Sequence, residues 1–303
     1  HGLRDEGGFT LRDGVRTMAD LMRNRGFSTG GVSSTFLLRR ATGLARGFAF
    51  YNADLPETEA GAPPAIVRSG AQTLDTAQTW MRQQGNQRYF LMLDVPGESA
   101  EAVLGRLVEE LKTKQLYDQA TIIVTGERGQ SGSGASIEDA SIHVPLTVKL
   151  PGQEGAGRVS DVPVQHIDLL PTMLDFVRAP VPGNLRGRSL RPLLDDDQPL
   201  PATSIYSESL EAALRFGGYP VYALTAAPVR LIRGATDQLV MLDGSAPDES
   251  RLAPLRTALD ALLKDRPFPA PSPVAAADAR RFALAGYADG LRTWIRSEEH
   301  TSE

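Results

Sequence analysis

The residues best suited to chemistry in this chain lie in one short turn, at positions 126–130. Glu127 and Arg128 follow the β-branched run 121–125 and precede Gly129. Such a run bounded by Gly predicts a buried strand, and ligands of open α/β sheets bind at the carboxyl ends of strands. A Glu carboxylate can hold a hard cation. Arg keeps its proton and has no acceptor atom, so it can bind an anion but no metal.

The same turn has a simpler interpretation, in which Glu127 and Arg128 form a solvated ion pair that contributes little energy. Asp168 precedes a predicted helix, where it is better suited to capping the first turn than to acid catalysis. His143 could be a ligand, but no second His or Cys lies near it in the sequence, so a hydrogen-bonded His is favoured. The acidic run 195–197 favours a solvated turn over a calcium site, because its loop lacks spaced ligands.

Hydrophobic periodicity predicts the elements that position these residues. Helices are expected at 11–25, 73–84, 100–116, 167–177 and 251–263. Core strands are expected at 89–95, 120–126 and 144–150, a short strand or loop at 27–36, and shorter strands at 204–208, 221–226, 229–233 and 238–242. The alternation of helices and strands predicts an α/β fold with a mostly parallel sheet flanked by helices. The later short strands predict a small C-terminal antiparallel sheet.

Composition narrows the class of protein. The chain has 303 residues, a formal net charge of -5 and no cysteine. Mixed charges without a basic stripe argue against a nucleic-acid partner, and no apolar run is long enough for a transmembrane segment. We expect an α/β core at 1–200, an antiparallel α+β subdomain at 201–266, and a Pro-rich and polar tail at 267–303 whose last residues resemble non-native sequence. No pattern assigns an oligomeric state or a compartment.

Several segments, in order, resemble the sulfatase family of the alkaline phosphatase superfamily. The family's His-Gly-Val-Arg-Asn, Thr-Leu-Ala-Glu, Arg-Gly-Phe, Leu-Pro-Gly, His-x-Asp-Leu-x-Pro-Thr and Gly-x-Ser-Leu patterns have counterparts at 1–5, 17–29, 46–51, 141–152, 166–172 and 187–194. A further match lies at 283–287. The resemblance implies an alkaline-phosphatase-like fold, incomplete at its N-terminus, and a sulfuric ester hydrolase that uses calcium or magnesium. It also implies periplasmic or exported placement.

The same resemblance reveals departures at the family's metal site. The family strand ends in Thr-Ala-Asp-His-Gly-Glu, whose Asp and His hold the metal, whereas Glu127 and Arg128 stand there in this chain. The family's Cys-x-Pro-x-Arg nucleophile motif and its paired Asp ligands do not occur in the sequence. The segment 32–35 replaces a Gly-Lys-Trp-His, and Asp94 runs almost directly into Gly97 where the family has a longer loop.

These departures predict a sulfatase-family protein that is inactive as given, with no catalytic residue and no cofactor in this chain. Glu127 is then a vestigial metal ligand, Arg128 an anion-binding candidate for a small sulfated or phosphorylated ligand, and Asp168 and Gly129 structural residues near the site. Two alternatives stay open. The protein is a non-catalytic anion- or protein-binding scaffold, or the full-length protein is a metal-dependent sulfate or phosphate ester hydrolase.

Overall fold

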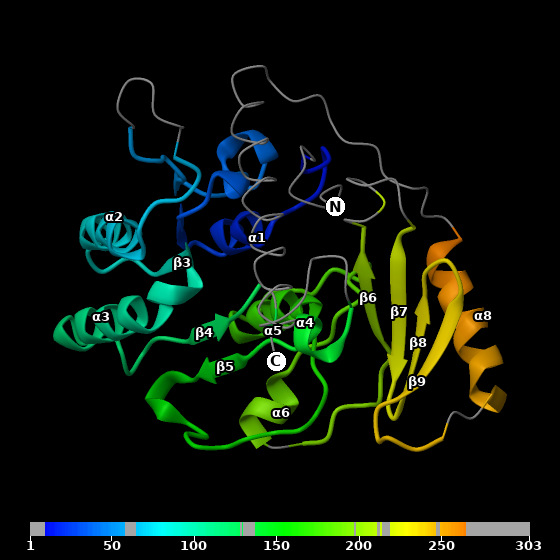
Figure 1. Ribbon diagram of the computed structural model, residues 1–303. Coiled ribbons are helices and arrows are strands. Elements are labelled where there is room, and N and C mark those ends of the chain that lie inside the picture. The colour runs from blue at the N-terminus through cyan, green and yellow to red at the C-terminus, as the bar shows by residue number, and fades with distance from the viewer. Residues whose placement is uncertain are drawn as a thin grey trace, which may run out of the picture. The chain divides into compact units, whose positions relative to one another are not determined.

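The computed structural model describes residues 10–57, 65–127, 129, 137–196, 198–210, 213, 219–246 and 249–264. The chain forms two compact units. The first contains the described residues within 10–122 and 148–199, and the second contains those within 123–147 and 200–264. Figure 1 shows their helices and strands. The predicted domain boundaries near 200 and 266 stay a prediction.

The first unit is built around a three-stranded parallel sheet of order β2-β1-β3. Its elements are α1 (Met18–Asn24), β1 (Ser28–Ser33), η1 (Phe36–Leu38), η2 (Arg40–Thr42), β2 (Phe50–Asn52), α2 (Gly70–Gln83), β3 (Tyr89–Asp94), η3 (Gly97–Ser99), α3 (Ala100–Thr113), η4 (Pro151–Gln153), η5 (His166–Asp168), α5 (Leu169–Phe176) and α6 (Arg191–Asp196). A separate two-stranded sheet is formed by β4 (Ile122–Thr125) and β5 (Leu146–Lys149).

Two adjacent glycines explain how β1 fits between its neighbours. A Cβ on Gly30 would lie 2.6 Å from the Trp80 ring of α2, and a Cβ on Gly31 would lie 2.6 Å from the Tyr51 ring of β2. Neighbouring residues of a strand face opposite sides of its sheet. The Gly-Gly pair therefore lets large aromatic rings pack closely on both faces of the central strand.

Local capping determines where the first two helices begin. Thr17 and Asp20 form a capping box at α1, and Ser69 and Gln72 form one at α2. The predicted helix at 11–25 is wrong over its first seven residues, because Gly14 adopts φ 77° and Thr17 is the N-cap. The structure also adds β2 and α6, neither of which was predicted.

The second unit contains an antiparallel sheet of order β6-β7-β8-β9. Its elements are α4 (Asp139–Ile142), β6 (Ile205–Ser209), β7 (Val221–Ala226), β8 (Val229–Arg233), β9 (Asp237–Met241), η6 (Glu249–Arg251) and α8 (Leu252–Leu263). Leu224, Leu231 and Leu259 are fully buried in the core that the sheet forms with α8, and Figure 1 shows α8 beside these strands. The fold class is therefore as predicted: a mixed α/β protein with a parallel sheet, flanking helices and a C-terminal antiparallel sheet.

Candidate functional site

Polar side chains gather at the carboxyl edge of the parallel sheet, where β1 and β3 end side by side. Ser33 pairs in register with Asp94, and its hydroxyl donates to Asp94 Oδ2 at 2.7 Å. The backbone N–H and the hydroxyl of Ser34 reach the same oxygen at 3.3 Å and 3.4 Å. This is the edge of an α/β sheet at which ligands bind. Here the Asp94 carboxylate is already hydrogen-bonded by donors of the chain itself.

Arg68 ties the end of β2 to the start of α2 at the same edge. Its Nη1 donates to Asn52 Oδ1 at 2.5 Å and to the Asp54 carbonyl at 3.2 Å. Its Nε donates to the Thr73 hydroxyl of α2 at 3.0 Å. The side chain is buried, and burial lowers the pKa of its guanidinium, while the charges of Asp54 and Asp94 act in the opposite direction. Arg68 is thus a buried cation that fixes the loop after β2.

Tyr51, the middle residue of β2, contributes a buried hydroxyl to the same sheet. The hydroxyl donates to the Leu38 carbonyl, and burial is the main cause that raises its pKa to about 12. The negative charge of Asp94 raises this pKa further, whereas Arg40 lowers it. A phenol in this state remains protonated at physiological pH, so it can donate a hydrogen bond but cannot act as a base.

The sequence patterns do not single out Asn52, Arg68 or Tyr51 as site residues. None of them lies in a periodic pattern that points to a site, and Arg68 is adjacent to the N-cap of α2. The chain brings Arg68 to the sheet through a bridge between Thr35 and Val67 that pairs distant segments. The sequence did mark this edge in one way. The segments 32–35 and 94–97, which differ from the family's patterns, contain Ser33, Ser34 and Asp94.

The turn after β4 belongs to the other unit. Glu127 is exposed in a bend directly after that strand, and Arg128 lies outside the described residues. Gly129 donates its N–H to the Ser141 carbonyl at 2.9 Å, and a Cβ at this position would lie 2.1 Å from the Ala140 carbonyl oxygen. Gly129 therefore permits a close approach of two backbone segments. The roles proposed for Glu127 and Arg128 stay predictions.

Asp168 is buried and binds backbone donors. Its two carboxylate oxygens accept from the N–H groups of Gln165 and Arg188, each at 2.9 Å. The first contact completes a capping box at η5, and the second holds the segment after α5. His143 lies just before the strand predicted at 144–150, which begins two residues later than expected. It caps the end of the short helix α4, because its N–H donates to the Asp139 carbonyl at 2.8 Å and β5 begins only at Leu146.

The family resemblance implies a divalent cation, and the described residues do not fit one. Within the part of the chain that the structure describes, no group of three or more His, Asp or Glu side chains that could hold a metal comes together. Asp94 accepts from Ser33 and Ser34, so its nearest partners are donors, whereas a hard cation needs several converging oxygens. No chemical step through a metal follows from this arrangement.

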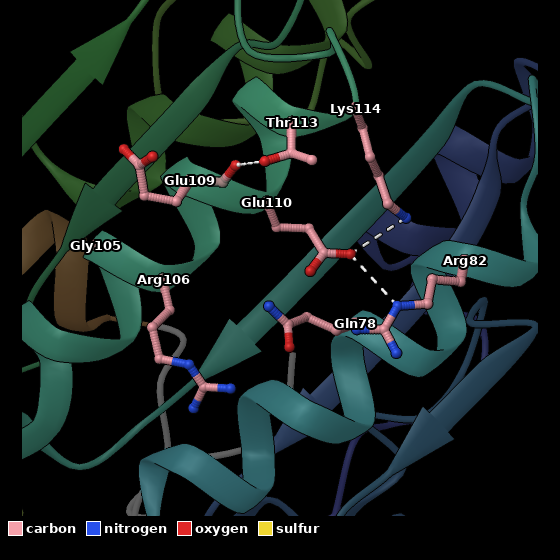
Figure 2. Close-up of a pocket in the computed structure, with 8 residues that line it drawn as sticks. All are labelled: Gln78, Arg82, Gly105, Arg106, Glu109, Glu110, Thr113 and Lys114. Atoms are coloured by element: carbon pink, nitrogen blue, oxygen red, sulfur yellow. Dashed lines mark hydrogen bonds and ion pairs between the residues drawn. The ribbon is translucent and has the colours of Figure 1, made fainter.

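A groove of 590 Å³ lies between α2 and α3, apart from the sheet edge. Figure 2 shows Glu110 between two cations, with its Oε1 3.5 Å from Arg82 Nε and 3.3 Å from Lys114 Nζ. Arg106, also on its wall, pairs with Asp75 at 2.7 Å. Arg82, Arg106 and Lys114 are thus each engaged in an ion pair along this groove.

None of the helices that the structure describes has the length and apolarity to cross a bilayer.

The chain is similar in sequence to known sulfatases. Residues 135–236 match the family model described as N-sulphoglucosamine sulphohydrolase, C-terminal. The chain is 36% identical over 99 residues to arylsulfatase K of Canis lupus familiaris. The aligned segment covers 31% of this chain and 18% of that protein. It is 28% identical over 131 residues to N-acetylglucosamine-6-O-sulfatase of Bacteroides thetaiotaomicron. This second alignment covers 41% of this chain and 23% of that protein. The matched segment thus spans less than a quarter of either relative.

Solved structures resemble a larger part of the chain. A protein described in complex with its substrate D-glucosamine-2-N,6-O-disulfate superposes with a TM-score of 0.69 and 14% identity, covering 87% of this chain and 84% of that chain. The phosphonate monoester hydrolase of Silicibacter pomeroyi gives a TM-score of 0.64 and 19% identity, covering 86% and 81%. At these identities the likeness concerns the fold.

Proposed function

Because this chain belongs to the sulfatase family of the alkaline phosphatase superfamily, we propose that it binds a small sulfated ligand. In this proposal the residues described above do not hydrolyse the ligand. The observation that carries this proposal is the state of Asp94. Its carboxylate accepts hydrogen bonds from Ser33 and Ser34 at the ligand-binding edge of the sheet. Three donors of the chain share the Oδ2 atom of Asp94, so this oxygen is engaged as a hydrogen-bond acceptor. A metal-dependent hydrolase instead needs several oxygens that converge on a cation.

The class of ligand is inferred from the relatives. A structure of the same fold is described with a disulfated glucosamine as its substrate, and the sequence relatives are named as sulfatases. Arg128 is the proposed anion-binding group, because a guanidinium can bind two oxygens of a sulfate at once. Glu127 beside it is a vestigial metal ligand in this proposal.

The second candidate function is metal-dependent hydrolysis of sulfate or phosphate esters by the whole protein. The sequence similarity to arylsulfatase K favours this candidate. In that case other residues would complete the centre, and Glu127 would be one of the metal ligands. The two candidates differ in what calcium or magnesium does to the protein.

The test combines binding and turnover on the chain as it is. We expect isothermal titration to detect D-glucosamine-2-N,6-O-disulfate, Arg128→Ala to weaken this binding by about tenfold, and the exposed control Arg12→Ala to leave it unchanged. We also expect no release of sulfate from the disulfate or from an aryl sulfate, with or without millimolar calcium or magnesium. Equal affinity of wild type and Arg128→Ala would refute the binding proposal. Sulfate release that Glu127→Gln abolishes would establish the hydrolase instead.

A further inference from the structure

A second charged surface lies at the opposite, amino edge of the parallel sheet. The segments 21–28, 82–93 and 176–182 contain five arginines and no Asp or Glu, although the whole chain has a net charge of -5. Segments 21–28 and 82–93 lead into β1 and β3, whose first residues Ser28 and Tyr89 pair in register. The fold therefore gathers at one edge the positive charge of segments that are far apart in the sequence.

Hydrogen bonds connect the three segments into one surface. Arg25 Nη2 donates to the carbonyls of Val177 and Arg178 at 3.2 Å and 2.9 Å. Arg88 Nη2 donates to the Arg25 carbonyl at 3.2 Å, and its guanidinium stacks 4.7 Å from the centre of the Phe27 ring. These contacts hold both side chains in place, which lowers the entropy lost when a ligand binds them.

The guanidinium groups keep their charge and many of their donors. Among the described residues, no ion pair joins Arg25, Arg88 or Arg178 to a carboxylate, whereas the neighbouring Arg23 lies 3.5 Å from Asp20. Arg25 and Arg88 use only Nη2 in the hydrogen bonds above, whereas each guanidinium has five N–H donors. All three arginines are exposed. The surface thus presents forked donors and uncompensated positive charge to the solvent.

Exposed amides stand beside these arginines. Asn24, Asn86 and Gln87 are all exposed in the same two segments, and an amide can both donate to and accept from a hydroxyl. Guanidinium groups fit the oxygens of sulfate, and amides fit the hydroxyls of a sugar. We propose that the amino-edge patch, formed by Arg25, Arg88, Arg178, Asn24, Asn86 and Gln87, binds the chain of a sulfated polysaccharide.

This patch is separate from the candidate site at the carboxyl edge. The strands between the two edges have six residues, which corresponds to a length of roughly 20 Å. A small sulfated sugar therefore cannot occupy both places. The patch would anchor the protein on a polymer, and the proposed function does not depend on it.

The experiment measures binding of the full chain to heparin over a range of salt concentrations. We expect Arg88→Gln with Arg178→Gln to weaken binding by about tenfold and to flatten its salt dependence, because two charge contacts to the polyanion are lost. The control, Arg12→Gln with Arg106→Gln, makes the same change of net charge on exposed arginines elsewhere and should change affinity by less than about twofold. Equal losses in the two double variants would overturn the proposal, as would unchanged binding in the first.

Thermal melts and a competing polyanion separate specific binding from unfolding and from general charge attraction. The melts should show the same midpoint for both double variants, and if the first melts lower, Arg88→Lys with Arg178→Lys keeps the charge and should retain most of the binding. Single-stranded DNA of matched charge should bind more weakly than heparin, and equal or tighter binding of the DNA would overturn the choice of a sulfated polysaccharide. Loss of disulfated glucosamine binding in Arg128→Ala with heparin binding intact separates the proposed function from this patch.

Discussion

Replacing Asp94 by Asn tests whether its carboxylate accepts hydrogen bonds from the chain or binds a cation. In the structure one carboxylate oxygen accepts from the Ser33 hydroxyl at 2.7 Å, and from the N–H and hydroxyl of Ser34 at 3.3 Å and 3.4 Å. Asn keeps the shape and one acceptor oxygen but removes the charge. The contacts to the serines would therefore become neutral hydrogen bonds in nearly the same geometry.

The size of the effect follows from the contacts. A hydrogen bond to a charged group contributes about 1.5–3 kcal/mol and a neutral one about 0.5–1.5 kcal/mol. Only the 2.7 Å contact to Ser33 is short enough to count in full. We therefore expect Asp94→Asn to lower the free energy of unfolding by about 1 kcal/mol. For a protein of this size that corresponds to a fall in Tm of roughly 2–4 °C.

A metal site would give the opposite pattern. Carboxylates clustered for a cation repel one another without it, so neutralising one would raise the stability of the metal-free protein. A cation at a hundred times its Kd would stabilise the wild type by about 2.7 kcal/mol. That increase would shrink or vanish in Asp94→Asn.

The assay is a thermal melt of wild type and Asp94→Asn, each with EDTA and with millimolar calcium. We expect the variant to melt lower than wild type by the same amount in both buffers. A calcium-dependent rise in the Tm of the wild type that the variant loses would refute the assignment of Asp94 as a hydrogen-bond acceptor. A variant more stable than wild type in EDTA would refute it as well.

The remaining predictions concern the two cores. Asp237 accepts from two arginines, whose hydrogen bonds lower the pKa of its carboxyl, with the bond from Arg233 as the largest cause. Its stabilisation is present above the unfolded pKa and is lost as pH falls through the folded one. Asp237→Asn should thus lower the free energy of unfolding by about 1 kcal/mol near neutral pH. In acid, thermal melts should show a smaller difference in Tm between wild type and variant, and a difference that stays constant with pH would contradict this prediction. Gly30→Ala should cost about 2 kcal/mol by forcing a Cβ against the Trp80 ring. The matched control Gly105→Ala, in open space within α3, should stabilise by about 0.5–1 kcal/mol in urea titrations.

Local patterns in the sequence were sufficient for most elements of the fold. The apolar run 89–95 predicted β3 and the spaced leucines of 100–116 predicted α3, since strand and helix periodicities are properties of neighbouring residues. The later short strands β7 and β8 lie at the predicted residues. The family resemblance was also read from the sequence, because its motifs are short and occur in order.

Long-range contacts decided what the sequence alone left open. Residues 46–51 showed no strand pattern, and β2 exists because Gly30 and Gly31 of β1 offer it a partner. Local propensity does not encode such a pairing.

The candidate site was decided in the same way. Ser33 and Asp94 are 61 positions apart and Arg68 is 16 positions from Asn52, so only the parallel pairing of β1 with β3 and the entry into α2 bring them together. The sequence by itself determined most of the elements, the resemblance to the sulfatase family and the residue types. The tertiary structure decided that Asp94 is hydrogen-bonded by serines and that arginines from three separate segments lie together at the amino edge, because both results depend on which strand ends meet.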